Sequence, residues 1–211
     1  SEITLCISAS SVMGDICNAV GKAMVAYAKN IMMIIFKHFT NTALDIQLKS
    51  HLLILCGDLA LALGPDFRPY LSETLELLKV VSTLSSSEDD DVDYIEAVDE
   101  IKSSCLETYT SILQGMYQIE PITGEDFQVW SPHISYTLHL IDTISQDPNH
   151  SDSIACSSCG LLGDLLHTFK SNIKSALNTA SIQKLIHEAS HSSASKTKTV
   201  GVWLQKLLQS V

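Results

Sequence analysis

Apolar residues recur along this chain at helical spacing. Gly64 and Pro65 predict the end of one helix, because glycine favours a C-cap and proline cannot continue the hydrogen-bond ladder. The leucines before them stand three or four residues apart, as on one side of a helix: Leu48, Leu52, Leu55, Leu59 and Leu63. With few alternating β-branched runs, the pattern predicts an all-α fold with helices near 9–20, 23–39, 43–63, 67–83, 94–117, 130–145, 151–169, 171–190 and 196–210.

A Gly-Asp pair recurs inside three of the predicted helices, and a second amphipathic helix follows each of them. Gly14 and Gly57 are separated by 43 residues, and the distance to Gly163 fits two more periods with insertions, one of them the acidic loop 85–93. A two-helix unit of this length is typical of HEAT or armadillo repeats. We therefore expect residues 1–211 to form one solenoid segment of about four antiparallel helix pairs, in which the recurrent glycines let neighbouring helices approach closely.

The charge is strongly acidic and unevenly distributed. The chain has 24 acidic and 13 basic residues, a net charge of −11, which argues against nucleic acid as a ligand. Residues 165–211 are the exception, with six lysines and one acid, Glu188. A long acidic surface suits a basic protein partner, although acidity also serves solubility alone.

The remaining composition indicates a reduced, non-membrane protein. The longest uninterrupted apolar run, Ile31–Phe36, is too short to span a bilayer, so we expect no membrane insertion. The first residues lack the pattern of a signal peptide, and the missing initiator Met suggests a piece of a longer chain. We expect the cysteines to be buried thiols of a cytosolic or nuclear protein: Cys6, Cys17, Cys56, Cys105, Cys156 and Cys159.

Six stretches carry motifs in a fixed order along the chain: Val12–Cys17, Cys56–Gly64, Cys105–Gly115, Leu161–Leu165, Ile186–Glu188 and Lys198–Trp203. In this order they resemble the C-terminal HEAT repeats of the importin-β (karyopherin-β) family of nuclear import receptors. Even the acidic 85–93 insertion falls where the family has one. The resemblance implies a right-handed superhelical HEAT solenoid, the C-terminal end of a longer receptor that shuttles between cytoplasm and nucleus through the nuclear pore.

The resemblance also implies partners. In this family the second helix of each pair, the B helix, lines the concave face of the superhelix. Through that face the C-terminal half grips the basic importin-β-binding segment of importin-α, or basic cargo segments. A weaker site for the Phe-Gly repeats of nucleoporins lies between the outer, or A, helices. The GTPase Ran acts mainly through the N-terminal half of the receptor, which this chain does not include.

Acidic residues on the B helices are our candidates for contacting a basic segment. Asp15, Asp58 and Asp164 recur in register, and Glu107 stands near the equivalent place in the unit between. Because packed helices lie about 8–10 Å apart, such acids would form a ladder facing a Lys/Arg-rich helix. Alternatively, the aspartates hydrogen-bond between repeats and are structural. The next candidates, Asp99 and Glu100, precede Glu107 by one to two turns.

The two tryptophans have different expected roles. Trp203 resembles a family tryptophan on the last B helix that stacks on the partner, and tryptophan is a common interface anchor. Packing within the terminal hairpin is the alternative, because tryptophan is usually largely buried. Trp130 is expected to have a structural role at a helix start marked by Ser131 and Pro132.

Two motifs resemble catalytic ones but lack their context. His187, Glu188 and His191 satisfy H-E-x-x-H, yet neither the acidic nor the Gly-x-x-His third ligand of zinc enzymes follows. Cys156 and Cys159 form a C-x-x-C motif inside an apolar helix, without the strand–helix setting of a redox pair. The resemblance implies a carrier and not an enzyme, and with neither motif complete we expect no cofactor and no metal. The alternatives are a HEAT-repeat scaffold or adaptor subunit of another complex, and a zinc-dependent enzyme.

Overall fold

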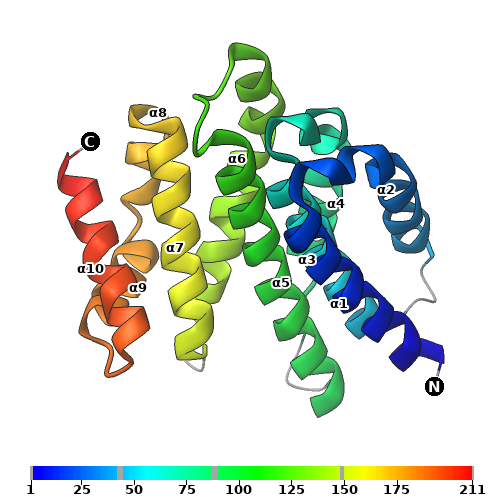
Figure 1. Ribbon diagram of the computed structural model, residues 1–211. Helices are drawn as coiled ribbons and strands as arrows, with labels where there is room; N and C mark the ends of the chain where they lie inside the picture. The colour runs from blue at the N-terminus through cyan, green and yellow to red at the C-terminus, as the bar shows by residue number, and fades with distance from the viewer. Residues whose placement is uncertain (1, 42–44, 87–89, 148–149, 211) are drawn as a thin grey trace. The chain divides into compact units, whose positions relative to one another are not determined.

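The computed structural model describes residues 2–41, 45–86, 90–147 and 150–210 (Figure 1). Every regular element in these ranges is a helix, which confirms the all-α prediction. The chain forms two compact units, Ser1–Glu120 and Pro121–Val211. The acidic loop predicted at 85–93 includes residues 87–89, outside the described residues, and its last two residues already belong to a helix.

The first unit is built from helices in two rows. Its elements are α1 (Glu2–Val20), η1 (Gly21–Met24), α2 (Val25–Phe39), α3 (Ile46–Leu63), η2 (Gly64–Tyr70), α4 (Leu71–Ser82) and α5 (Val92–Tyr117), where η marks a 3-10 helix. Helix α3 packs between α1 and α5, while α2 packs on α3 and α4 on α5 (Figure 1). The helices α1, α3 and α5 therefore form the row expected for B helices.

The predicted leucine stripe forms the core of this unit. All five of its leucines are buried in α3, from Leu48 to Leu63. The helix ends where predicted, at Gly64, whose φ of 59° lies in the left-handed region that favours glycine. Phe67, which follows in η2, is fully buried and stacks at a tilt on Tyr70.

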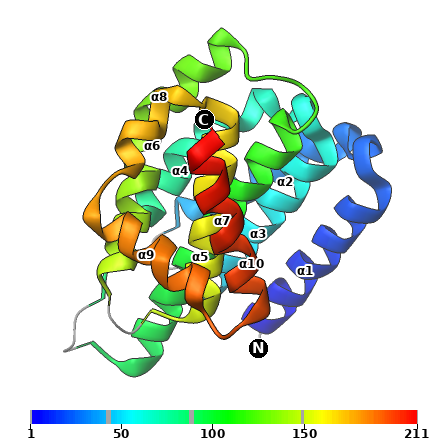
Figure 2. The same ribbon diagram turned by 90° about the vertical axis from the view of Figure 1, so that its left-hand side faces the viewer.

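The second unit surrounds an aromatic core. Its elements are α6 (Gly124–Gln146), α7 (Asp152–Phe169), α8 (Ser171–Lys174), η3 (Ser175–Leu177), α9 (Ala180–His191) and α10 (Ser195–Ser210). Helix α10 lies against both α7 and α9, and α9 also contacts α6 (Figure 2). The fully buried Trp130 meets Phe169 edge-on at a ring distance of 5.7 Å.

Helix α1 begins at Glu2, not near 9, and the helix predicted over 67–83 is divided into η2 and α4. Threonine caps explain two further predicted limits that are wrong. Helix α6 begins at Gly124, not near 130, because the Thr123 hydroxyl accepts a hydrogen bond from the Asp126 amide. Pro132 therefore lies inside the helix, and Trp130 packs in its second turn, not at its start. The single helix predicted over 171–190 is divided into α8, η3 and α9, because Thr179 caps the start of α9.

The ends of three helices confirm the internal repeat in geometry. Gly21, Gly64 and Lys170 each follow a motif glycine by seven residues and stand directly after α1, α3 and α7. All three have positive φ, at 59°, 59° and 53°. A residue with positive φ therefore follows the Gly-Asp helix in each of these three repeats, and after α7 that residue is a lysine.

Two helical stretches meet a length and hydropathy test for crossing a membrane. They are Glu2–Phe39 and Ile46–Ser82. In the most apolar 18 residues of each stretch, 11% and 56% respectively are buried. Each contains a 3-10 joint between two helices, and α3 is a core helix packed between α1 and α5. The sequence argument from the longest apolar run overlooked these stretches, because single polar residues interrupt them.

Candidate protein-binding surface

The motif glycines are the points where B helices touch. A Cβ atom at Gly14 in α1 would overlap the carboxylate of Asp58 in α3. One at Gly57 in α3 would lie 3.1 Å from the Ser111 side chain in α5, and one at Gly163 in α7 would overlap the indole of Trp203 in α10. The expectation that these glycines permit close helix approach is thus confirmed, and each receives a side chain from the next B helix.

Asp58 combines a structural contact with a charge near the surface. The half-buried carboxylate accepts a hydrogen bond from the Asn18 amide of α1 at 3.1 Å. Burial raises the pKa of Asp58, the neighbouring Asp15 charge raises it further, and the Asn18 hydrogen bond opposes both. The structural alternative therefore holds in part, because Asp58 links two repeats.

Helix α5 supplies three of the candidate acids. Asp99, Glu100 and Glu107 are all exposed, and Lys102 lies 3.9 Å from Asp99. Glu107 is one turn before Ser111, the residue that meets Gly57. Asp15, Asp58 and Glu107 thus lie within about one turn of the contacts that join α1, α3 and α5.

Two residues of this surface escaped the sequence analysis. Glu96 is exposed on α5, four residues before Glu100 and eleven before Glu107, so helical periodicity would have identified it. Asn18 has no signal of its own in the sequence, because its role depends on the register between α1 and α3. We call the surface formed by Asp15, Asn18, Asp58, Glu96, Asp99, Glu100 and Glu107 the acidic row.

In the second unit, Asp164 and Trp203 lie at the α7–α10 contact. The Trp203 ring covers Gly163, yet 41% of the residue remains exposed. Asp164 follows Gly163 directly and is half-buried. Trp203 is thus half-covered: its ring packs on α7, and part of the residue stays exposed.

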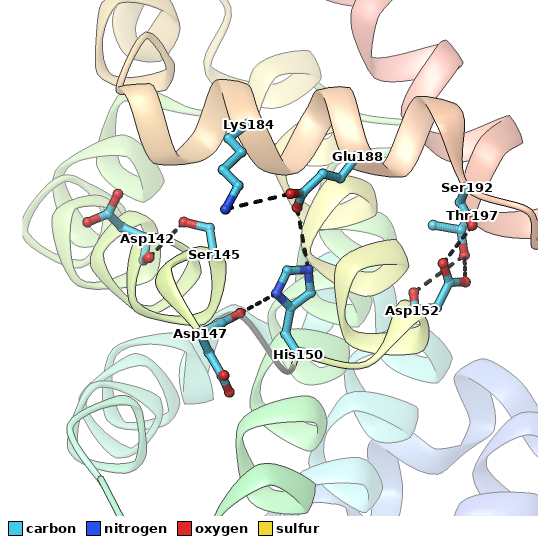
Figure 3. Close-up of polar contacts among 9 residues, drawn as sticks. All are labelled: Asp142, Ser145, Asp147, His150, Asp152, Lys184, Glu188, Ser192 and Thr197. Carbon is cyan, nitrogen blue, oxygen red and sulfur yellow. Dashed lines mark hydrogen bonds and ion pairs between the residues drawn. The ribbon is translucent and has the colours of Figure 1, made fainter.

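A polar cluster connects the start of α7 with α9 and α10 (Figure 3). Glu188 in α9 lies 3.6 Å from Lys184 and 3.8 Å from His150 in the α6–α7 connection. At the start of α7, Asp152 accepts hydrogen bonds from the hydroxyls of Ser192 and Thr197 at 2.6 and 2.5 Å. These hydrogen bonds lower the pKa of Asp152, and the cluster ties α7 to α9 and α10.

The H-E-x-x-H residues take part in local contacts. The rings of His187 and His191 lie 4.2 Å apart, and Nδ1 of His191 is 2.8 Å from the His187 carbonyl oxygen. Glu188 faces Lys184 and His150, as Figure 3 shows. Across the described ranges, no three His, Cys, Asp or Glu side chains are grouped as metal ligands.

The cysteines are free, and their setting makes most of them unreactive. All are buried except Cys6, whose predicted burial is wrong because it lies on an exposed side of α1. Burial raises the pKa of Cys56 to about 12, and burial together with Cys156 does the same for Cys159. A redox pair needs a thiolate at neutral pH, so the raised pKa of Cys159 disfavours redox chemistry at the C-x-x-C motif.

Comparison with known proteins gives one consistent result. The family model described as "Importin subunit beta-1-like, TPR repeats" matches residues 1–190. Importin subunit beta-1 of Schizosaccharomyces pombe is 26% identical over 204 residues, and that of Arabidopsis thaliana is 25% identical over the same length. Each alignment covers 96% of this chain but 23% of the relative, so the chain spans about a quarter of their length.

Solved structures agree with the fold. A crystal structure of importin beta superimposes with a TM-score of 0.89 and 23% identity, over 99% of this chain and 24% of that one. Structures of yeast Kap95p in work on RanGDP and in a complex with Nup1 give TM-scores of 0.84 and 0.83. Both are 20% identical and cover 96% of this chain and 23% of theirs. The helical solenoid class predicted from the repeats is therefore confirmed.

Proposed function

The chain belongs to the importin subunit beta-1 family, and from that membership we propose that it is part of a nuclear import receptor. The receptor carries proteins through the nuclear pore and shuttles between cytoplasm and nucleus. It works by binding, without a catalytic step, a cofactor or a metal. Support comes from the family match over 190 residues and from the acidic row on the B helices.

The partner that we propose is the basic importin-β-binding segment of importin-α, or a basic segment of cargo. The single observation that carries this proposal is the placement of Asp15, Asp58 and Glu107 near the contacts of three adjacent B helices. A Lys/Arg-rich helix laid across the row would meet one carboxylate from each repeat. Such ion pairs orient the segment and raise its association rate. A single exposed ion pair contributes little affinity.

Trp203 and Asp164 are a second proposed contact for the same kind of segment. An arginine guanidinium could stack on the exposed part of the indole while the neighbouring carboxylate accepts its hydrogen bonds. Glycine at 163 matters here, because its missing Cβ leaves the space in which the ring lies. Small sliding movements between packed helices would allow loading and release of the partner.

Two further partners follow from relatives. The structures of Kap95 concern a complex with Nup1 and the effect of Kap95p on RanGDP. We propose that Phe-Gly repeats of nucleoporins bind this chain between A helices such as α2 and α4. Ran would act mainly through the part of the longer relatives that this chain does not cover.

A peptide titration tests the main proposal. The chain is titrated with a labelled basic N-terminal peptide of importin-α at about 50 and 200 mM salt. We expect saturable binding that weakens at the higher salt and loses about three- to tenfold in Glu107→Gln and in Trp203→Ala. Glu73→Gln is the matched control, since it removes the same charge from the exposed side of the A helix α4.

The outcomes separate the candidate functions. If Glu73→Gln weakens binding as much as Glu107→Gln, only the overall charge matters, and the acidic row is not the site. A second outcome is that the folded chain fails to bind the peptide while a full-length receptor binds it. If Glu107→Gln and Trp203→Ala then leave the affinity of the full-length receptor unchanged, the assignment of these residues is wrong. A full-length protein that ignores the peptide would favour a HEAT scaffold or adaptor of another complex.

A further inference from the structure

A groove in the second unit differs in character from the acidic row. Its volume is about 940 Å³, and it lies between the α8–η3 segment, α9 and the C-terminal half of α10. Leu177, Ile186 and Leu208 supply its apolar lining. The polar residues around them include Lys174, Asn178, Gln183, Gln205 and Gln209.

Hydrogen bonds hold two of the amide side chains in place. The Gln183 amide nitrogen donates to the Leu177 carbonyl oxygen at 3.1 Å, and that of Gln205 donates to the Ser190 hydroxyl at 3.0 Å. Amide side chains both donate and accept hydrogen bonds, so they suit the alternating N–H and C=O groups of a peptide backbone. The groove therefore offers polar sites for a main chain beside an apolar site for a side chain.

The charge that the groove lining carries is positive. Lys174 is its charged lining residue, and among the described residues that line it none carries a carboxylate. The only acid in residues 165–211, Glu188, is engaged by Lys184 and His150 in the cluster of Figure 3. The groove thus belongs to the one strongly basic stretch of an acidic chain.

We propose that this groove binds an acidic peptide segment, a partner of the opposite charge to that of the acidic row. A carboxylate of the segment pairs with Lys174, an apolar side chain lies against Leu177, Ile186 and Leu208, and the amides of the wall pair with its backbone. Size supports this, because the volume is that of a binding site for a short segment, not of a packing defect.

The test uses the 211-residue chain and a short labelled peptide of alternating leucine and glutamate. At about 50 mM salt we expect saturable binding, which a peptide with glutamine for glutamate does not show. Lys174→Glu should weaken binding about tenfold. Lys198→Glu makes the same charge change on an exposed part of α10 outside the groove, and it should weaken binding less than about twofold.

A second variant tests the apolar lining. Leu208 is only half-buried, so Leu208→Ala should leave the helical circular dichroism unchanged. It should weaken the binding of the acidic peptide at least about threefold. Equal losses with Lys174→Glu and Lys198→Glu, or no saturable binding by the folded chain, would overturn the proposal. The basic importin-α peptide should bind Lys174→Glu as it binds the unaltered chain, so failure here leaves the acidic row untouched.

Discussion

Lys170 occupies a backbone conformation that the equivalent positions reserve for glycine. Its φ of 53° and ψ of −130° closely match those of Gly64, at 59° and −134°. A non-glycine residue in such a region costs on the order of 1–3 kcal/mol, whereas glycine adds some entropy to the unfolded chain.

We therefore expect Lys170→Gly to raise the free energy of unfolding by about 0.5–1.5 kcal/mol in urea titrations. Lys174→Gly is the matched control, because Lys174 has helical backbone angles, and glycine there should destabilise by up to about 1 kcal/mol. If both variants lose stability, the joint at Lys170 is not strained.

Glycines at helix contacts differ in what surrounds them. A Cβ at Gly201 would lie 2.5 Å from the Ser190 amide nitrogen and 2.7 Å from the Ala189 carbonyl carbon, both backbone atoms of α9. At Gly14 the obstacle is the end of the Asp58 side chain, which can rotate away.

Gly201→Ala should thus destabilise the chain by about 2 kcal/mol or more, although alanine favours a helix by about 1 kcal/mol. Gly14→Ala should change the free energy of unfolding by less than about 1 kcal/mol, because the two effects oppose each other. Thermal unfolding followed by circular dichroism compares them, and a smaller loss at 201 than at 14 would contradict this assignment.

The ionised carboxylate of Asp58 lowers the stability of the fold. Its pKa is raised in the folded state, so at pH values above that pKa the charge reduces the free energy of unfolding. This reduction disappears as the pH falls through the raised pKa towards the ordinary value of 3.8. Asp58→Asn keeps an acceptor for Asn18 and removes the charge.

We expect Asp58→Asn to raise the free energy of unfolding at pH 7 by about a few tenths of a kcal/mol, a small gain because solvent screens a half-buried charge. The same substitution should lower the affinity for a basic peptide. The gain should vanish near pH 4 in urea titrations across pH. A purely structural Asp58 would give lower stability and unchanged binding.

At the scale of elements, the start of α9 is fixed by one side chain. The Thr179 hydroxyl accepts a hydrogen bond from the Ile182 amide at 3.3 Å and separates α9 from η3. Thr179→Ala should cost about 1 kcal/mol in urea titrations, and Thr179→Ser should restore most of it. Thr143→Ala is the control, because the Thr143 hydroxyl bonds within α6 at an exposed site; an equal loss there would remove the case for the cap.

Helix interiors could be predicted from the sequence better than helix ends. The leucine stripe of α3 is continuous, so its burial follows directly from periodicity. Pro132 misled the prediction for α6, because proline usually marks a helix start, whereas here Thr123 caps the helix nine residues earlier. The break before α9 was missed because Asn178 and Thr179 interrupt no apolar spacing.

At the scale of the whole molecule, the repeat predicted that glycines would meet neighbouring helices but not what would enter the space. Asp58 at Gly14 and Trp203 at Gly163 depend on the register between helices that are 40 residues or so apart in sequence. The acidic row has the same limit: the sequence predicted all its members but Asn18 and Glu96 one helix at a time, while the alignment of Asp15, Asp58 and Glu107 across α1, α3 and α5 required the packed structure.

Charge also distinguishes the two units. Residues 1–120 contain 17 acids and seven bases, whereas residues 121–211 contain seven acids and six bases. Repulsion within the first unit opposes its compact state, and salt screens repulsion between exposed charges. Raising the salt concentration should therefore stabilise the first unit and leave the second almost unchanged.

Hydrogen exchange read by mass spectrometry measures both units in one sample. Between about 50 and 500 mM sodium chloride, we expect protection of α3 and α5 to rise severalfold while that of α7 and α10 stays nearly constant. The second unit is the internal control, because salt effects on hydrophobic packing act on both. Equal gains in the two units would mean that packing, not charge repulsion, sets the salt response. A gain confined to the first unit would identify its acidity as a feature that costs stability and is therefore suited to a basic partner, whose binding would relieve the same repulsion.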